Sequence, residues 1–173
     1  MTSSADDLRF LTEALSHLQD YLLSNELYWP LSGSLPRLTP GSLLLTLTRM
    51  EVVQPLQAQR LRAQVDLVRG KWRTAWEKKI ARETANRLRL WSQFLSDYAT
   101  APEQNVDSYP TEARGRAILQ LLLREMPDAP EKSALAEVDA MLKAQLHFDE
   151  FLWGAEFQTA FPEADFWFLY AKL

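Results

Sequence analysis

The chain has no cysteine, two histidines and five glycines among its 173 residues. The absence of cysteine excludes disulfides, thiolate metal sites and a cysteine nucleophile, and it favours the reducing cytoplasm. So few glycines are unusual for a fold with many tight turns or with a glycine-rich phosphate loop. Helices joined by short connections suit this composition, which therefore predicts an all-α protein.

Long apolar runs are lacking as well. No stretch approaches the roughly 18 residues that a membrane-spanning helix needs. Met1–Asp7 has no positive charge followed by an apolar stretch, so no secretory signal is visible. Hydrophobic residues make up 47% of the chain and charged residues 24%, as in ordinary globular proteins. We expect one soluble, cytoplasmic domain over residues 1–173, without a membrane partner.

Motifs of catalysis and metal binding are also missing. The sequence has no glycine-rich phosphate loop, no GxSxG motif, no HExxH motif and no paired-histidine ligand set. Glu13, His17 and Asp20 have the best metal-like spacing, but their helix face lies opposite a leucine stripe, and we interpret them as solvated surface residues. We therefore predict no metal, no cofactor and no catalytic residue, and we favour a non-catalytic protein over an enzyme.

Apolar periodicity and capping signals predict the helices in the first third of the chain. Leucines at 8, 11, 15, 18 and 22 form one stripe of a helix that begins near Ser4 and fades around Asn25. The Ser4-x-x-Asp7 spacing suggests the cap of this helix. Thr39-Pro40 supplies an N-cap and a first helical residue for a short helix over residues 40–51. Alternation of apolar and polar residues keeps a strand over residues 43–53 as an alternative.

The connections and the later helices follow from the same signals. Residues 27–40 contain three prolines and a glycine, which predicts an ordered loop, and its apolar residues suggest that it covers the core. A polar connection is expected over 97–110. Helices are predicted over 111–125 and 131–146. Together these elements give a bundle of four to six helices around one long basic segment.

The long segment runs from Pro55 to about residue 99. As one straight helix it would span about 67 Å, whereas a compact chain of this size has a diameter of roughly 40 Å. Either the helix breaks near Gly70, or a second copy of the chain covers it. This length mismatch is the observation behind a homodimer or another protein partner.

The apolar stripe of the long segment is interrupted by Lys79, Glu83 and Arg87 at four-residue steps. Exposed ion pairs at this spacing contribute a few tenths of a kcal/mol. A buried cluster of charges is expensive and usually serves a purpose. Burial of this polar cluster would therefore indicate a small-molecule site or an enzyme.

Charge is distributed unevenly. Residues 56–91 carry ten cations and three anions, a net charge of +7, within a chain whose net charge is −4. A basic helix can neutralise phosphates of nucleic acid, or the acidic helices around it can balance its charge, which is the interpretation we favour. The candidate nucleic-acid-binding cations are Arg69, Lys71, Arg73, Lys78, Lys79 and Arg82.

Two tryptophans of the basic segment can be interpreted either as core residues or as exposed rings that bind a ligand. Trp72 and Trp76 share the apolar face among these cations; base stacking requires exposed rings, and we favour the core for both. Nine of the 19 aromatic residues lie in the last 26 residues, where helical periodicity is lost. We expect this segment to wrap around the helices. The alternative is a protein interface, for which the candidates are Trp29, Phe166, Trp167, Phe168 and Tyr170.

Three hypotheses for function follow. The first is a non-catalytic protein-interaction or scaffold module, as a homodimer that uses the long helix or the aromatic tail. The second is nucleic-acid binding through residues 60–89. The third is a small-molecule or enzymatic site at residues 79–87.

Overall fold

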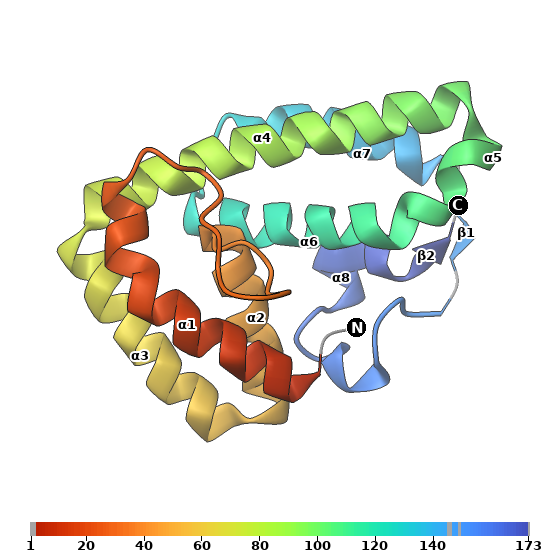
Figure 1. Ribbon diagram of the computed structural model, residues 1–173. Helices are drawn as coiled ribbons and strands as arrows, with labels where there is room; N and C mark the ends of the chain where they lie inside the picture. The colour runs from red at the N-terminus through yellow and green to blue at the C-terminus, as the bar shows by residue number, and fades with distance from the viewer. Residues whose placement is uncertain (1–2, 145–146, 149, 173) are drawn as a thin grey trace. The chain divides into compact units, whose positions relative to one another are not determined.

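The computed structural model describes residues 3–144, 147–148 and 150–172 (Figure 1). The protein is all-α, as predicted: strand structure within these residues is limited to β1 (His147–Phe148) and β2 (Ala171–Lys172), which pair antiparallel. Each helix in the described ranges is too short or too polar to cross a lipid bilayer. The chain forms two compact units, Met1–Glu83 and Thr84–Leu173, called here the N-terminal and the C-terminal unit. A single domain over residues 1–173 stays a prediction.

In the N-terminal unit two helices pack on a third, central helix, α2. α1 (Ser4–Leu23) and α3 (Pro55–Lys71) both pack against α2 (Pro40–Val53) and against each other (Figure 1). α2 is buried almost all round from Pro40 to Met50, as expected of a helix that is apolar on every face. The helix predicted over 40–51 is confirmed and extends to Val53, and the strand alternative over 43–53 is wrong.

α1 begins at Ser4, as predicted, but its capping residues lie one position before the predicted ones. The N-cap is Ser3, whose hydroxyl accepts the backbone N–H of Asp6 while the Asp6 carboxylate accepts the N–H of Ser3. The predicted cap of Ser4 and Asp7 is therefore wrong, because Ser3 and Asp6 complete the capping box one position earlier. Asp7 instead forms a buried ion pair of 3.1 Å with Arg49 of α2.

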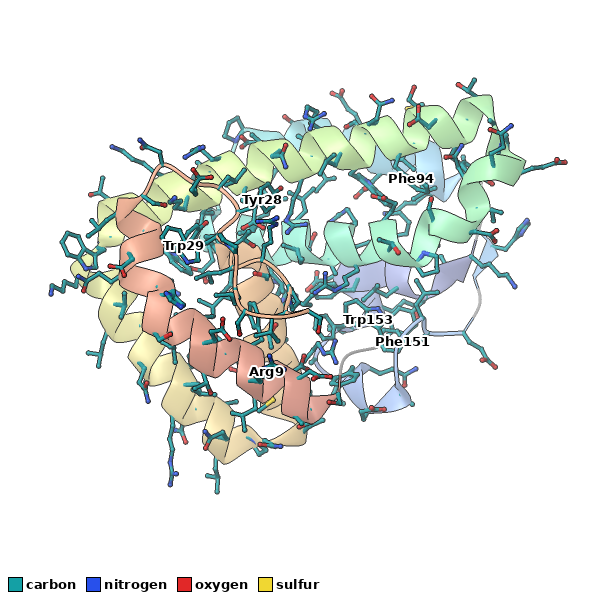
Figure 2. The ribbon with its side chains drawn as sticks, viewed as in Figure 1. Arg9, Tyr28, Trp29, Phe94, Phe151 and Trp153 are labelled. Atoms are coloured by element: carbon teal, nitrogen blue, oxygen red, sulfur yellow. The ribbon has the colours of Figure 1, made fainter. Side chains whose placement is uncertain are left out.

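The loop between α1 and α2 is ordered and held against α1. The backbones of Trp29 and Leu38 exchange two hydrogen bonds, and Gly33 takes a φ of +61°, which favours glycine. Glu13 accepts hydrogen bonds from the backbone N–H and the hydroxyl of Ser32. In Figure 2 Trp29 lies beside α1, where its ring centroid is 6.4 Å from that of Tyr21.

The long segment breaks near Gly70, which is the first of the two alternatives given by its length. α3 ends at Lys71, and α4 (Arg73–Thr100) follows after Trp72, whose φ of −115° and ψ of 40° are not helical. The predicted break near Gly70 is thus confirmed. The 28 residues of α4 span about 42 Å. Residues 73–83 of α4 belong to the N-terminal unit and the rest to the C-terminal unit.

The C-terminal unit continues from α4 through the short α5 (Pro102–Asn105) and a 3-10 turn to α6 (Tyr109–Glu125) and α7 (Glu131–Lys143). The polar connection expected over 97–110 is therefore mostly helical, because Pro102 and Pro110 stand in the first turns of helices, where proline is tolerated. α7 ends before the predicted residue 146; residues 145 and 146 lie outside the described residues.

The aromatic tail completes the core of the C-terminal unit, as the wrapping interpretation predicted. Its short elements are a 3-10 turn (Ala155–Phe157), α8 (Glu163–Phe166) and a second 3-10 turn (Trp167–Leu169). Phe161, Phe166 and Phe168 are completely buried. The hydroxyl of Tyr109 on α6 donates to the carbonyl of Phe168 at 2.7 Å. Figure 2 shows Phe151 and Trp153 beside each other in this tail, with ring centroids 6.1 Å apart.

A buried ion pair joins α6 and α7. Arg116 donates to Asp139 at 2.7 Å, and both side chains are at least nine-tenths buried. The indole N–H of Trp91 donates to the same carboxylate at 3.0 Å. The guanidinium carbon of Arg116 also lies 4.6 Å from the ring centroid of Phe168. This charged centre has no counterpart in the sequence analysis, because its members are 23 or more residues apart.

Candidate anion-binding pocket

The polar interruption of α4 is buried at two of its three positions. Lys79 is 3% exposed and Glu83 is completely buried, whereas Arg87 is half-buried. Lys79 and Glu83 belong to the N-terminal unit and contact different segments of it. Arg87 belongs to the C-terminal unit, where its guanidinium lies near Gly115 of α6.

Glu83 holds the beginning of α2. Its carboxylate accepts the hydroxyl of Thr39 and the backbone N–H of Gly41, both at 2.7 Å. Thr39 is the N-cap of α2 and accepts the N–H of Ser42 in turn. The carboxylate therefore satisfies an otherwise orphan donor at the positive end of the helix. This arrangement gives a structural reason for a buried charge at position 83.

Lys79 holds the end of α1 and the first residues of the loop. Its ammonium donates to the carbonyl of Glu26 and to the hydroxyl of Ser24, and it lies 4.3 Å from the ring centroid of Tyr21. Burial, followed by the positive charge of Arg82, lowers the pKa of Lys79. Burial, followed by the negative charge of Glu83, raises the pKa of Tyr21. The neutral phenol donates to the carbonyl of Leu27 at 3.0 Å.

A concave pocket of about 570 Å³ opens beside Lys79. Its walls are the end of α1 with the start of the loop on one side, and the α3–α4 junction with the first turns of α4 on the other. We call it the basic pocket, because five cations and no carboxylate line it. The lining residues are Leu22, Leu23, Ser24, Asn25, Lys71, Trp72, Arg73, Thr74, Ala75, Lys78, Lys79 and Arg82.

Five of the six candidate nucleic-acid-binding cations thus come together in the basic pocket. Arg69 does not line it: this side chain forms an ion pair with Asp66 at 3.5 Å and lies over the ring of Trp76. The chain turns at Trp72, which brings Lys71 of α3 next to the cations of α4. On α4, Arg82 lies beside both Lys78 and Lys79, because it follows them by four and three residues.

Most cations of the basic pocket have no carboxylate partner within the described residues. Arg73 forms an exposed ion pair with Glu77 at 2.8 Å. Arg82 donates to the carbonyl of Asn25 at 3.0 Å, and Lys79 also binds a backbone carbonyl. Lys71 lies 5.5 Å from the ring centroid of Trp72. Among the described residues, acidic groups reach the pocket cations at Arg73, through Glu77, and at Lys79, through the nearby charge of Glu26. The acidic balance that we favoured from the sequence is therefore incomplete at the pocket.

The two tryptophans of this region have different surroundings. Trp76 is 3% exposed, in the core as predicted. Trp72 is half-buried and lines the basic pocket, so the prediction of a core position holds only in part for it. The reason is the helix break: at the C-cap of α3, Trp72 does not follow the apolar face of either helix.

Sequence reasoning missed the polar residues that close the pocket. Ser24 and Asn25 follow the end of α1, and Thr74 lies in the first turn of α4. Serine and asparagine after a helix are ordinary C-terminal signals, so nothing in the sequence distinguished them. Asn25, for example, lies 57 residues before Arg82 in the chain, so no local pattern relates the two.

The candidate interface residues have unequal exposure. Phe166 and Phe168 are completely buried in the C-terminal unit, which leaves them no surface for a partner. Trp29, Trp167 and Tyr170 are half-buried. Trp167 lies under the ammonium of Lys143, at 4.7 Å from its ring centroid. A protein interface at these three residues stays a prediction.

Comparison with known proteins gives no match: no protein-family model, no curated protein and no solved structure matches the chain. Function is therefore inferred from the geometry of the basic pocket.

Proposed function

We propose that this protein binds nucleic acid through the basic pocket. The observation that carries the proposal is a cavity of about 570 Å³ lined by five cations and by no carboxylate. Phosphates of a nucleic-acid backbone bind such a lining because each neutralised phosphate releases condensed counterions. The hydroxyls of Ser24 and Thr74 and the amide of Asn25 add neutral hydrogen-bonding groups of the kind that position a phosphate backbone.

The spacing of the cations supports a repeating ligand rather than a single ion. Arg73 and Arg82 are nine residues apart on α4, which corresponds to a rise of about 13 Å. Along the axis of B-DNA the phosphates of one strand are spaced by about 3.4 Å, and those of an unstacked single strand lie further apart. A strand that runs along this part of α4 therefore brings at most about three or four phosphates to the pocket cations.

The distribution of charge also favours the N-terminal unit as the part of the protein that binds nucleic acid. Residues 1–83 carry 11 cations and 9 anions, whereas residues 84–173 carry 8 cations and 14 anions. The net negative charge of the whole chain opposes long-range attraction of nucleic acid. Binding should therefore depend on short-range contacts at the basic pocket and should weaken as salt rises.

The proposal is tested by fluorescence anisotropy with a labelled oligothymidylate of about ten nucleotides, a typical single-strand site size. Three or four phosphate contacts predict a slope of log K against log salt of about −2 to −3, since each contact contributes about −0.7 on a single strand. The Lys71→Glu/Lys78→Glu variant should bind at least about tenfold more weakly and show a flatter slope. Lys79 and Arg82 are left intact because they also hold the loop.

Arg60→Glu/Arg89→Glu is the matched control. It reverses two exposed helical cations of the same basic segment that do not line the pocket. Its net charge equals that of the test variant, so only the position of the charges differs. The proposal fails if the wild-type protein does not bind the oligonucleotide at low salt, if both variants weaken binding equally, or if labelled polyglutamate binds as tightly.

A further inference from the structure

The most unusual member of the basic pocket is the aromatic ring of Trp72. It stands between Lys71 and Arg73 in the chain, and all three side chains line the same cavity. Trp76, one helical turn later, is buried in the core. The helix break thus separates two tryptophans that the sequence places on one face, and it leaves Trp72 alone at the pocket wall.

No hydrogen bond to the described residues holds the indole of Trp72. Its N–H is buried and has no acceptor within the described part of the chain, as is also true of Trp76 in the core. What distinguishes Trp72 from Trp76 is therefore its place in the lining of the basic pocket. Lys71 lies at 5.5 Å from the ring centroid and is an exposed side chain, so a ligand can displace it from the ring.

An aromatic ring among cations is the combination that recognises a base together with its phosphates. Every base offers a π-face to an aromatic side chain, while the flanking phosphates meet the cations. In a duplex both faces of each base are covered by its neighbours, so a ring in a pocket reaches only the unstacked bases of a single strand. The cavity of about 570 Å³ lies within the usual range for small-ligand pockets, which suits one nucleotide.

We propose that the basic pocket selects single-stranded nucleic acid and that Trp72 stacks on one base of the strand. The flanking phosphates then bind Lys71, Arg73 and Lys78. This inference depends on the proposed function, since the cations must bind phosphate for the base to reach the ring. It adds that the ligand is single-stranded and that Trp72 positions one of its bases, neither of which the charges alone specify.

The test compares three labelled probes of equal length: an oligothymidylate, an abasic strand with the same phosphates, and a duplex. The wild-type protein should bind the oligothymidylate about tenfold or more tightly than either of the others, since one base–aromatic stack is worth roughly 5- to 150-fold. Trp72→Leu should lose this preference and leave the affinity for the abasic strand unchanged within about twofold. Trp72→Phe keeps a ring and should retain most of the preference.

Trp167→Leu is the matched control. It removes another half-buried tryptophan with a lysine over its ring, far from the pocket in sequence and in the other unit. This variant should bind all three probes like the wild type, and circular dichroism should show that both leucine variants remain folded.

The results of these measurements distinguish phosphate binding by the pocket cations from base stacking on Trp72. If the abasic strand binds as tightly as the oligothymidylate while charge reversal still weakens binding, stacking on Trp72 is wrong and the phosphate site stands. The same holds if Trp72→Leu weakens both strands equally, because that indicates a structural role. If no probe binds, or if charge reversal has no effect, both proposals are wrong.

Discussion

The carboxylate of Glu83 accepts a hydrogen bond of 2.7 Å from the backbone N–H of Gly41, which is 42 residues earlier in the chain. A side chain of α4 thereby completes the N-terminal cap of α2, the most buried helix of its unit. The cost of burying the charge is offset by two short hydrogen bonds and by the positive end of the helix dipole. Glu83 thus serves the fold of the unit that carries the basic pocket.

Removal of this carboxylate should destabilise the protein. In Glu83→Ala the hydroxyl of Thr39 and the N–H of Gly41 lose their acceptors in a buried site, which should cost about 2–4 kcal/mol. Glu83→Gln keeps one acceptor oxygen and should cost less. Urea denaturation measures the free energy of unfolding. Glu77→Gln removes only an exposed ion pair and should change it by less than about 0.5 kcal/mol; equal effects of Glu83→Ala and Glu77→Gln would contradict the interpretation.

The buried pair of Arg116 and Asp139 should show strong non-additivity. Asp139→Leu leaves the guanidinium buried without its carboxylate and removes the acceptor of Trp91, so a loss of about 3–5 kcal/mol is expected. Arg116→Met should cost a similar amount. The double variant should lose clearly less than the sum, because no unpaired charge remains. Thermal or urea unfolding of the three variants gives the coupling energy.

An exposed pair in the same unit provides the comparison. Asp165 accepts from Arg124 at 2.7 Å, and both side chains are about half exposed. Asp165→Ala should therefore cost at most about 1 kcal/mol. Additive effects at Arg116 and Asp139, or a similar cost for Asp165→Ala, would show that the buried pair contributes no more than a surface pair.

Two glycines should respond to alanine in opposite directions. Gly33 has a φ of +61°, and an added Cβ would lie 3.1 Å from the guanidinium of Arg9, so Gly33→Ala should destabilise by about 1–2 kcal/mol. Gly70 lies within α3, and a Cβ added to it would meet no neighbouring atom, so Gly70→Ala should stabilise by about 0.5–1 kcal/mol. Melting temperatures report both changes. A drop in melting temperature for Gly70→Ala would indicate that the α3–α4 junction needs the flexibility of glycine.

Lys79 should make the stability depend on pH in the alkaline range. Its pKa is lowered in the folded protein by burial and by Arg82, whereas the unfolded chain has the ordinary value near 10.4. Between the two values the unfolded state binds more protons, so the contribution of Lys79 to stability rises with pH. The difference in unfolding free energy between the wild type and Lys79→Met should therefore shift in favour of the wild type as pH rises from about 7 towards about 10.

Lys78→Met is the control for this titration, because Lys78 is the neighbouring lysine on α4 and its side chain is exposed. Its difference from the wild type should stay constant over the same range. Measurements should stop near pH 10, where the raised pKa of Tyr21 begins to add a loss of stability with rising pH. A Lys79→Met difference that is flat over this range would rule out a lowered pKa for Lys79.

Features with a local cause were predictable from the sequence. The Thr39-Pro40 cap, the first residue of α3 at Pro55 and the helix α1 depend on neighbours within a few positions, and the structure confirms them. Of the leucine stripe of α1, the residues at 11, 18 and 22 are buried and those at 8 and 15 are half-buried. The length of the segment left a break near Gly70 and coverage by a second copy as alternatives, and the structure has the break at Trp72. The cap of α1 was placed one residue late because Ser3 and Ser4 offer the same chemistry, and only the partner carboxylate decides between them.

The candidate site was predictable only as a group of charges. The sequence indicated that cations gather on one segment and that the apolar stripe of α4 is interrupted at Lys79 and Glu83. Ser24, Asn25 and the half-buried ring of Trp72 could not be foreseen as members of the pocket, because their position depends on where α1 ends against α4 and on the turn at Trp72.

The sequence by itself determined the helical class, most helix boundaries and the basic character of residues 56–91, since helix periodicity, capping and charge are local properties of the chain. The tertiary structure decided which charges are buried, what they bind and which of the two tryptophans reaches a surface. These outcomes depend on contacts such as Glu83 with Gly41 and Arg82 with Asn25, whose partners lie too far apart in the chain for any local pattern to relate them.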